Sequence, residues 1–224
     1  MKKHVIIVAG GSGSRMKADI PKQFLTLLEY PILMHTIKEF YSNDSSINIV
    51  LVLPVTQFDY WQKLISKHSF DIEHSVVKGG DTRFASVRNG LESIDGNGLV
   101  AIHDGARPLV SQTIITTTFN QAAINGNAIA SVALKDSIRQ TTKTNNWMVN
   151  RKDYRIIQTP QTFDIELIKK AFKNANPSRQ YTDDASVLED LNMKVYLVEG
   201  DYENIKITTP EDIIMAEAIL NSRQ

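Results

Sequence analysis

The residues best suited to chemistry are two cations that follow a glycine-rich segment near the N-terminus. The segment AGGSGS at residues 9–14 combines glycines with small serines, so its backbone can turn several N–H groups toward one point, which suits phosphate oxygens. Arg15 and Lys22 then supply positive charge, and Pro21 fixes the backbone beside Lys22. We interpret this segment as a polyphosphate site; the alternative is a plain strand-to-helix turn followed by a solvated arginine.

The two common phosphate-binding motifs do not explain these glycines. Met16 stands where the dinucleotide fingerprint G-x-G-x-x-G has its third glycine, and the Gly-Lys-Ser/Thr of a P-loop does not follow. An anion site here is therefore of another kind.

A second polar group lies in GGDTRFASVRNGL at residues 79–91. Asp81 or Thr82 is expected to cap a helix, with Arg83 and Ser86 near its positively polarised N-terminus. A glycine pair and an aspartate at the end of a strand could read the edge of a base. A capped helix with an exposed arginine explains the same residues.

Asp104 falls at the carboxyl end of an expected buried strand, the edge of an open α/β sheet where ligands collect. Opposite a polyphosphate site its carboxylate could meet a ribose hydroxyl or Mg²⁺. The competing interpretations are a turn or N-cap for Asp104 and a salt bridge to it from Arg107. His103 is expected to pack at the strand end rather than to act as a base. Lys206, between two isoleucines, is either a third cation of the anion site or an edge-strand charge.

The elements that must position these residues alternate along the chain, the pattern of βαβ units. Strands are expected at residues 4–9, 47–53, 72–77, 99–103, 127–134, 194–199 and 204–208. Helices are expected at residues 31–41, 56–68 and 111–124, and again after residues 82, 163, 182 and 209. The pattern predicts an α/β fold, a mainly parallel sheet with helices on both faces. Thr182 is the expected cap of its helix, which explains Asp183 and Asp184 better than a metal site does.

Residues 135–154 break the alternation. They are mostly polar, and Asn145 and Asn146 suggest a turn, so we expect a protruding β-hairpin arm. Trp147 and Met148 would be exposed on such an arm unless a partner covers them, which favours dimerisation through it. The alternative is that they fold back on their own domain.

Composition limits the possible functions. The 224 residues suit one α/β domain, and 25 basic side chains balance 25 acidic ones, so no overall field attracts nucleic acid or an anionic membrane. The absence of cysteine excludes thiol chemistry and is compatible with a reducing cytoplasm. The apolar run after Lys2 and Lys3 is too short for a signal peptide or a membrane span.

Together, the segments AGGSGSRM, PKQF, GGDTRFASVRNGL, HDGARP, QTPQTF, TDDASVLE and EGDYENIKITTPED closely resemble the 2-C-methyl-D-erythritol 4-phosphate cytidylyltransferases of the non-mevalonate isoprenoid pathway. The resemblance runs from about His4 to Leu220. It implies one Rossmann-like nucleotidyltransferase domain over residues 1–224 and a cytoplasmic homodimer whose arms, at about 135–154, cross between subunits. It also implies a reaction that uses CTP and Mg²⁺ and releases pyrophosphate.

The resemblance further implies roles for individual residues. The catalytic set would be Arg15, Lys22, Arg151 and Lys206. The CTP-binding set would be Ala9, Gly10, Gly11, Ser12, Gly13, Gly80, Asp81, Arg83, Ser86, Asp104 and Gly105. The polyol phosphate would meet Asp104, Arg107, Thr159 and Lys206 in one subunit and Ser137 and Arg151 of the partner's arm, with Asp104 as the metal ligand.

Three residues depart from the family's pattern. Gly105 and Gly10 stand where alanine is common, and Ser137 where threonine is typical. Ser137 keeps the hydroxyl, so we expect looser packing there with recognition kept. Two other functions stay open at this point. One is the same chemistry on another polyol phosphate such as ribitol 5-phosphate, and the other is a nucleotide-binding domain without catalysis.

Overall fold

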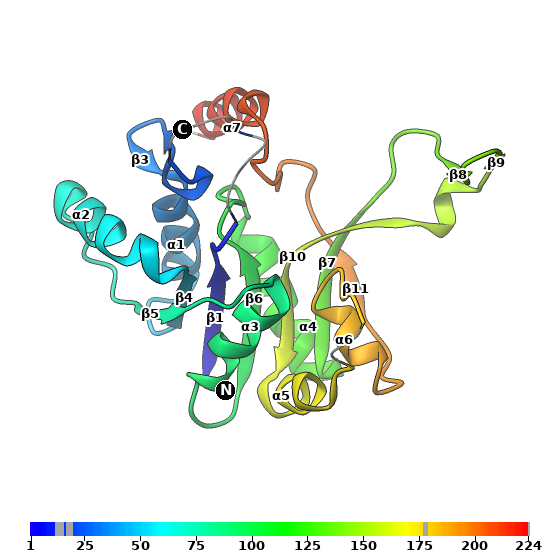
Figure 1. Ribbon diagram of the computed structural model, residues 1–224, viewed down its shortest axis with the longest axis horizontal. Helices are drawn as coiled ribbons and strands as arrows, with labels where there is room; N and C mark the ends of the chain where they lie inside the picture. The colour runs from blue at the N-terminus through cyan, green and yellow to red at the C-terminus, as the bar shows by residue number, and fades with distance from the viewer. Residues whose placement is uncertain (12–15, 17–19, 177–178, 224) are drawn as a thin grey trace.

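The computed structural model describes residues 1–11, 16, 20–176 and 179–223, so Ser12, Gly13 and Arg15 lie outside the described residues. In this part of the chain a seven-stranded sheet forms the centre, in the order β11-β7-β10-β6-β1-β4-β5 (Figure 1). Its strands are β1 (Lys3–Val8), β4 (Asn48–Leu53), β5 (Ser75–Lys78), β6 (Leu99–Asp104), β7 (Asn127–Ala133), β10 (Arg155–Asp164) and β11 (Leu197–Glu199). Only β10 runs antiparallel to its neighbours, which confirms the expected mainly parallel sheet.

Helices cover both faces of the sheet, because strand side chains alternate between two apolar cores. Val5 and Ile7 of β1 face one core, and Ile6 faces the other. The first core lies under α1 (Ile32–Asn43), α2 (Phe58–His68) and α4 (Gln112–Asn125), and the second under α3 (Arg83–Glu92), α5 (Ile165–Asn174) and α6 (Ala185–Glu189).

The stretch QTPQTF belongs to strand β10, whereas its polar composition predicts only a lead into the next helix. Gln158, Thr159 and Gln161 are nevertheless buried, because each finds hydrogen-bond partners inside the fold. The ladder between β10 and β7 breaks between Ile157 and Gln161. Such a bulge bends a strand and re-aims its side chains, here toward the carboxyl ends of the parallel strands.

Two other local expectations are wrong. Thr182 does not cap α6, which begins at Ala185; instead the carboxylate of Asp183 accepts the N–H of Ser186 at 3.0 Å. Residues 204–208 form an extended loop, not a strand. Its backbone hydrogen bonds reach other segments at single points, such as the bond from Ile207 N to Ala106 O at 2.8 Å.

A small layer closes the upper end of the sheet in Figure 1. It contains the 3-10 helix η2 (Lys22–Phe24), a short hairpin of β2 (Thr26–Leu27) and β3 (Tyr30–Pro31), and α7 (Pro210–Ser222). Helix α7 starts with a capping box of Thr209 and Asp212. Leu27, Ile207 and Ala216 belong to one buried cluster. The cluster joins the start of the chain to its end beside the sheet edge.

The arm extends away from the sheet as a hairpin (Figure 1). Strand β8 (Arg139–Thr141) pairs antiparallel with β9 (Asn146–Met148), and both are exposed. Trp147 is 46% and Met148 79% exposed, so within one chain neither folds back on the domain.

Among the described residues, the helices are all too short or too polar to cross a bilayer.

Candidate active site at the carboxyl ends of the strands

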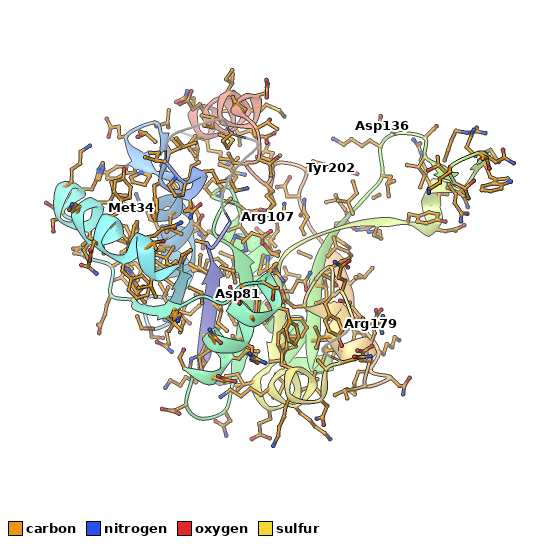
Figure 2. The ribbon with its side chains drawn as sticks, viewed as in Figure 1. Met34, Asp81, Arg107, Asp136, Arg179 and Tyr202 are labelled. Carbon is orange, nitrogen blue, oxygen red and sulfur yellow. The ribbon has the colours of Figure 1, made fainter. Side chains whose placement is uncertain are left out.

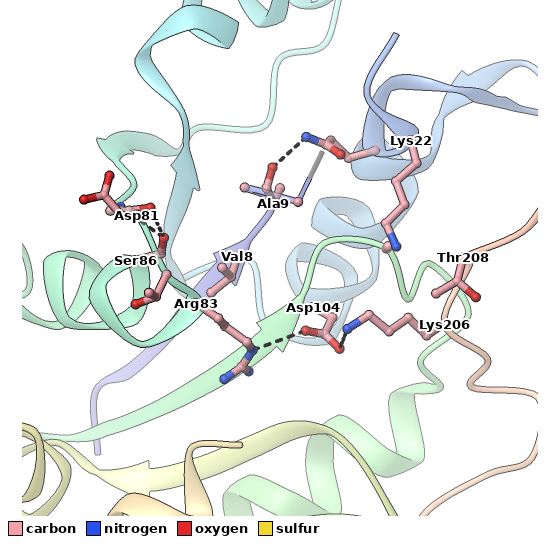
Figure 3. Close-up of a pocket in the computed structure, with 15 residues that line it drawn as sticks. Val8, Ala9, Lys22, Asp81, Arg83, Ser86, Asp104, Lys206 and Thr208 are labelled. Atoms are coloured by element: carbon pink, nitrogen blue, oxygen red, sulfur yellow. Dashed lines mark hydrogen bonds and ion pairs between the residues drawn. The ribbon is translucent and has the colours of Figure 1, made fainter. Parts of the chain in front are cut away.

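A cleft of about 410 Å³ opens where β1 and β6 end (Figure 3). Of the residues expected to bind CTP, it is lined by Ala9, Gly10, Gly11, Gly80, Asp81, Arg83, Ser86 and Asp104. Lys22 and Lys206 line it as well, from segments almost the whole chain apart. Five further residues line the cleft, of which the sequence predicts only Thr82, and that as a helix cap: Val8, Gln23, Thr82, Ala106 and Thr208.

The glycine turn before α3 forms one wall. Thr82 caps the helix by accepting the N–H of Ala85 at 3.0 Å, and the Ser86 hydroxyl accepts the N–H of Gly80 at 3.1 Å. A Cβ on Gly80 would lie 2.5 Å from that of Ala85, so only glycine fits there. The wall therefore presents backbone groups and the positive end of α3 to the cleft.

Lys22 reaches the cleft from η2. Its Nζ donates to Ile207 O at 2.8 Å, next to Lys206 in the chain. Beside it, Gln23 is buried and its Nε2 donates to Ala9 O at 2.6 Å and to Gln57 Oε1 at 2.8 Å. Gln23 thus fastens η2 to the end of β1. Its place in the PKQF segment, between Lys22 and Phe24, is the sequence signal that could have identified it.

Asp104 is surrounded by cations. Its Oδ2 lies 2.9 Å from Lys206 Nζ, and its Oδ1 lies 3.7 Å from Arg83 Nε (Figure 3). The same Oδ2 lies 3.4 Å from Arg107 Nε. Burial alone would raise the pKa of this carboxyl, but the three cations outweigh burial and lower it, so Asp104 is ionised. The salt bridge from Arg107 that we weighed against a binding role is present.

Arg83 is held from the other side by a buried carboxylate. Its Nη1 and Nη2 donate to Oδ1 and Oδ2 of Asp184 at 2.7 and 2.6 Å, and Asp184 is 1% exposed. Burial would lower the pKa of Arg83, but Asp184 and Asp104 raise it. This bidentate pair fixes the plane of the guanidinium at the edge of the cleft.

A second compartment of about 260 Å³ shares Arg83, Asp104 and Lys206 with the cleft. It adds Arg107, Ile157, Gln158, Thr159, Gln161, Thr182 and Asp183. Thr159 Oγ1 accepts the N–H of Asp104 at 3.1 Å, so the hydroxyl proton can turn toward a ligand. Thr182 and the two glutamines lie in the segments QTPQTF and TDDASVLE, whose polar residues we had attributed to a lead-in and a cap.

The structure does not bring Ser137 and Arg151 to either compartment within one chain. Both lie in the segment of the arm, where Arg151 Nη1 donates to Lys135 O. Figure 2 shows Asp136, the neighbour of Ser137, well away from Asp81 and Arg107 at the sheet. A role for these two residues at a site therefore requires the arm of a second chain.

His103 and Gly105 flank Asp104 in the chain. His103 is fully buried, and burial lowers its pKa to about 4, so it is a neutral packed residue, as expected. Gly105 does not line the cleft. A Cβ on it would lie 2.9 Å from the Ala9 Cβ, so a larger residue at this position would crowd Ala9.

The protein groups alone do not fit a resident metal ion. Among the described residues no three His, Cys, Asp or Glu side chains gather to hold one, and the oxygens of Asp104 and Asp184 face cations. A role for Asp104 as a metal ligand stays a prediction. A metal ion at this carboxylate would have to compete with Lys206, Arg107 and Arg83.

Comparison with known proteins identifies the family to which the chain belongs. The family model of 2-C-methyl-D-erythritol 4-phosphate cytidylyltransferase matches residues 3–222. The chain is 46% identical to the cytidylyltransferase of that name from Phocaeicola vulgatus over 220 residues, covering 98% of this chain and 100% of the relative. The enzyme of that name from Clostridium novyi is 40% identical over 225 residues, covering 99% of this chain and 97% of the relative.

Two solved structures share the fold over nearly their whole length. The 4-diphosphocytidyl-2C-methyl-D-erythritol synthase of Anaerococcus prevotii has a TM-score of 0.85 at 31% identity, covering 98% of each chain. The cytidylyltransferase of Thermus thermophilus has a TM-score of 0.82 at 28% identity, covering 99% of this chain and 100% of that one. The expected Rossmann-like fold is thereby confirmed, and the chain belongs to the 2-C-methyl-D-erythritol 4-phosphate cytidylyltransferase family.

Proposed function

We propose that this cytidylyltransferase joins CTP and 2-C-methyl-D-erythritol 4-phosphate in the two compartments, giving 4-diphosphocytidyl-2-C-methyl-D-erythritol and pyrophosphate. One observation carries the assignment of the site: two compartments meet at Asp104 and Lys206, with Lys22 bonded to the residue after Lys206. Two phosphate compounds can approach each other only where such cations offset their repulsion.

The larger cleft suits the nucleotide. In the proposal the backbone of Ala9, Gly10 and Gly80 reads the edge of cytosine, and Ser86 and Asp81 complete the base site beside the N-terminus of α3. Asp104 is ionised and can accept a ribose hydroxyl. The residues Gly11, Ser12, Gly13, Arg83 and Gly105 belong to the same proposed CTP site, although Gly105 would act by packing under Ala9.

The smaller compartment suits the sugar phosphate. Lys206 and Arg107 supply charge there, and Thr159 can donate its hydroxyl proton. The approach of a phosphate gives Lys206 a second anion besides Asp104, so the lysine can bridge the carboxylate and the incoming ligand. In the proposal Ser137 and Arg151 reach this compartment from the partner's arm.

The chemical step needs no general base. A phosphate monoester has a second pKa of about 6 and is largely dianionic near neutral pH, so its oxygen is already a nucleophile. That oxygen attacks the α-phosphorus of CTP in line with the departing pyrophosphate. Lys22 and Lys206, with Arg15, lower the barrier by holding the reactants and stabilising the charge that develops. The neutral His103 is not needed.

Magnesium enters this proposal with the substrate. The carboxylates of the described residues do not form a metal site, so we propose that Mg²⁺ arrives as the magnesium complex of CTP and adds charge neutralisation at the phosphates. A cytoplasmic location belongs to the same proposal, since a nucleotide substrate and a chain without cysteine are compatible with a reducing, nucleotide-containing compartment.

The test is release of pyrophosphate by the purified full chain. Each of the four nucleoside triphosphates is paired with 2-C-methyl-D-erythritol 4-phosphate, ribitol 5-phosphate and other polyol phosphates, with Mg²⁺ present. The proposal predicts that CTP with methylerythritol phosphate has by far the highest kcat/KM. Preference for ribitol 5-phosphate would overturn the substrate assignment, and binding of CTP without turnover would favour a non-catalytic domain.

A further inference from the structure

We infer that Asn204 is a positioning residue for the sugar-phosphate side of the reaction, because it ties together the segments that carry Arg107, Thr159 and Lys206. The inference rests on the proposed function, since it concerns the compartment assigned to the polyol phosphate. Asn204 lines neither compartment, so it acts only through residues that do.

The side chain of Asn204 is fully buried and bonds to β10. Its Nδ2 donates to Thr159 O at 2.9 Å and to Gln158 Oε1 at 3.3 Å. These acceptors lie at the break in the ladder between Ile157 and Gln161, where pairing with β7 is interrupted. An amide nitrogen carries two N–H groups and can satisfy both oxygens, whereas an aspartate would place oxygen against oxygen.

The main chain of the same residue holds a second segment. Arg107 Nη1 donates to Asn204 O at 2.7 Å, so the arginine that follows β6 is fixed against the loop. Lys206 stands two residues further on, and the loop is secured beyond it by the bond from Ile207 N to Ala106 O at 2.8 Å. The backbone on both sides of Lys206 is therefore fixed.

This anchoring matters because Lys206 is a flexible side chain, 39% exposed, that must meet Asp104 and the incoming phosphate. The reach of its ammonium depends on where its backbone is held. Displacing the loop would move Lys206, Arg107 and Thr159 relative to one another, and catalysis is sensitive to shifts of about 1 Å in such groups. The base-binding wall around Gly80 belongs to another segment and would stay in place.

The experiment compares Asn204→Ala with a matched buried asparagine in the full chain. Asn127 is 1% exposed; its Nδ2 donates to Lys194 O at 2.9 Å and its Oδ1 accepts the N–H of Tyr196 at 2.9 Å. It lies at the amino end of β7, the opposite edge of the sheet from the cleft. Asn127→Ala therefore removes hydrogen bonds of the same kind away from the site.

Steady-state kinetics of pyrophosphate release are measured for both variants with each substrate varied in turn. For Asn204→Ala we expect the KM for the polyol phosphate to rise about tenfold and kcat to fall, because two buried hydrogen bonds are lost. The KM for CTP should change by less than about twofold. Asn127→Ala should show a lowered melting temperature with both KM values unchanged.

A second variant tests the donor itself. Asn204→Asp keeps the volume of the side chain. Burial would raise the pKa of the new carboxyl, and the protonated carboxyl has one hydrogen-bond donor. The kcat/KM of Asn204→Asp for the polyol phosphate, divided by that of the wild type, should therefore increase as pH falls from about 8 to about 6. The ratio removes the titration of the substrate phosphate, and Asn127→Asp should give a flat ratio.

The outcomes separate the inference from the proposed function. Equal changes in both KM values, no change beyond that of Asn127→Ala, or a flat pH ratio for Asn204→Asp would overturn the inference while the wild type remains active. Failure of both Asn204 variants to fold when the Asn127 variants fold would show a purely structural role and would also overturn it. A wild type that releases no pyrophosphate from CTP with any polyol phosphate would instead overturn the proposed function, and the inference with it.

Discussion

At the scale of single residues, the site is built from charges held in fixed positions. Asp104 is ionised and lies against Lys206, Arg107 and Arg83, while the adjacent His103 is neutral and buried. Such a site is prepared for anions that bring their own nucleophile, because the protein supplies positioning and positive charge rather than proton transfer.

His74 gives the fold a predictable pH dependence. Trp61 Nε1 donates to its Nε2 at 3.0 Å, and its Nδ1 lies 2.7 Å from Ile72 O, which only the neutral ring protonated at Nδ1 satisfies. Burial lowers the pKa of His74 below 6.5, although the bond to Ile72 opposes this. The unfolded chain therefore binds the proton at a higher pH, so the free energy of unfolding is full above about 6.5 and falls below it.

The measurement is urea unfolding of the wild type and His74→Gln at pH 7 and pH 5. Glutamine keeps an acceptor for Trp61 without titrating. On acidification we expect the wild type to lose on the order of 1 kcal/mol more than the variant, the scale of one buried hydrogen bond. Equal losses in the two proteins would contradict this role of His74.

Charged residues and glycines that bind ligands can be predicted from the sequence. Gly80, Lys22 and Lys206 stand out by type and spacing, and the structure places them at one cleft. The residue types of Gln23 and Asn204 do not identify them in this way, although both lie in segments that carry the resemblance. A buried polar residue looks like a loop residue until its partner is known, and both find their partners in distant segments.

At the scale of elements, the buried pair of Arg83 and Asp184 fastens α3 to the start of α6. Asp184→Asn would leave the partly exposed guanidinium of Arg83 with only the more distant carboxylate of Asp104, so we expect a loss of about 2–3 kcal/mol in the free energy of unfolding. The double variant Arg83→Met with Asp184→Leu should recover most of this loss, because a buried ion pair replaced by apolar groups is often close to neutral.

Denaturant unfolding of the single variants Arg83→Met and Asp184→Leu and of the double variant gives the coupling energy. The matched control is Glu92→Gln, since Arg88 and Glu92 form an exposed pair on the same helix at 4.0 Å. That change should shift stability by less than about 0.5 kcal/mol. A double variant as unstable as the sum of its singles would show that the pair does not act as a unit.

Elements with an apolar period are likewise predictable, and those without one are not. The strands near residues 4–9, 47–53 and 99–103 appear as expected because their buried faces are continuous. The sequence does not predict β10, because polar side chains with internal partners replace the apolar pattern. The alternating isoleucines at 204–208 predict a strand, but the hydrogen bonds of this loop go to single points in other segments.

At the scale of the whole molecule, the arm lies away from both compartments of its own chain. Trp147 and Met148 are exposed on the hairpin, and Arg151 lies outside both compartments. A homodimer whose arms cross would cover the apolar residues and deliver Arg151 and Ser137 to the partner's sugar-phosphate compartment. We keep this assembly as part of the proposal.

Mixing two impaired variants tests whether the arm acts between chains. Lys22→Ala impairs the cleft and Arg151→Ala the arm, so in a mixed dimer one site combines an intact cleft with an intact arm. Random reassociation should restore activity to about a quarter of the wild-type level. The homodimer of each variant is the control, and no gain on mixing, with exchange verified by differently tagged chains, would show that Arg151 does not act in the partner's site.

The central claim is that Lys22 and Lys206 allow two phosphate compounds to meet and exchange a cytidylyl group. The most direct test is the single-turnover rate of pyrophosphate release from CTP and methylerythritol phosphate, with both substrates saturating, in Lys22→Ala and Lys206→Ala. Each rate should fall by roughly 10² or more, while Lys63→Ala, on the exposed surface of α2, should match the wild type. Rates near that of the wild type in both cleft variants would contradict the account.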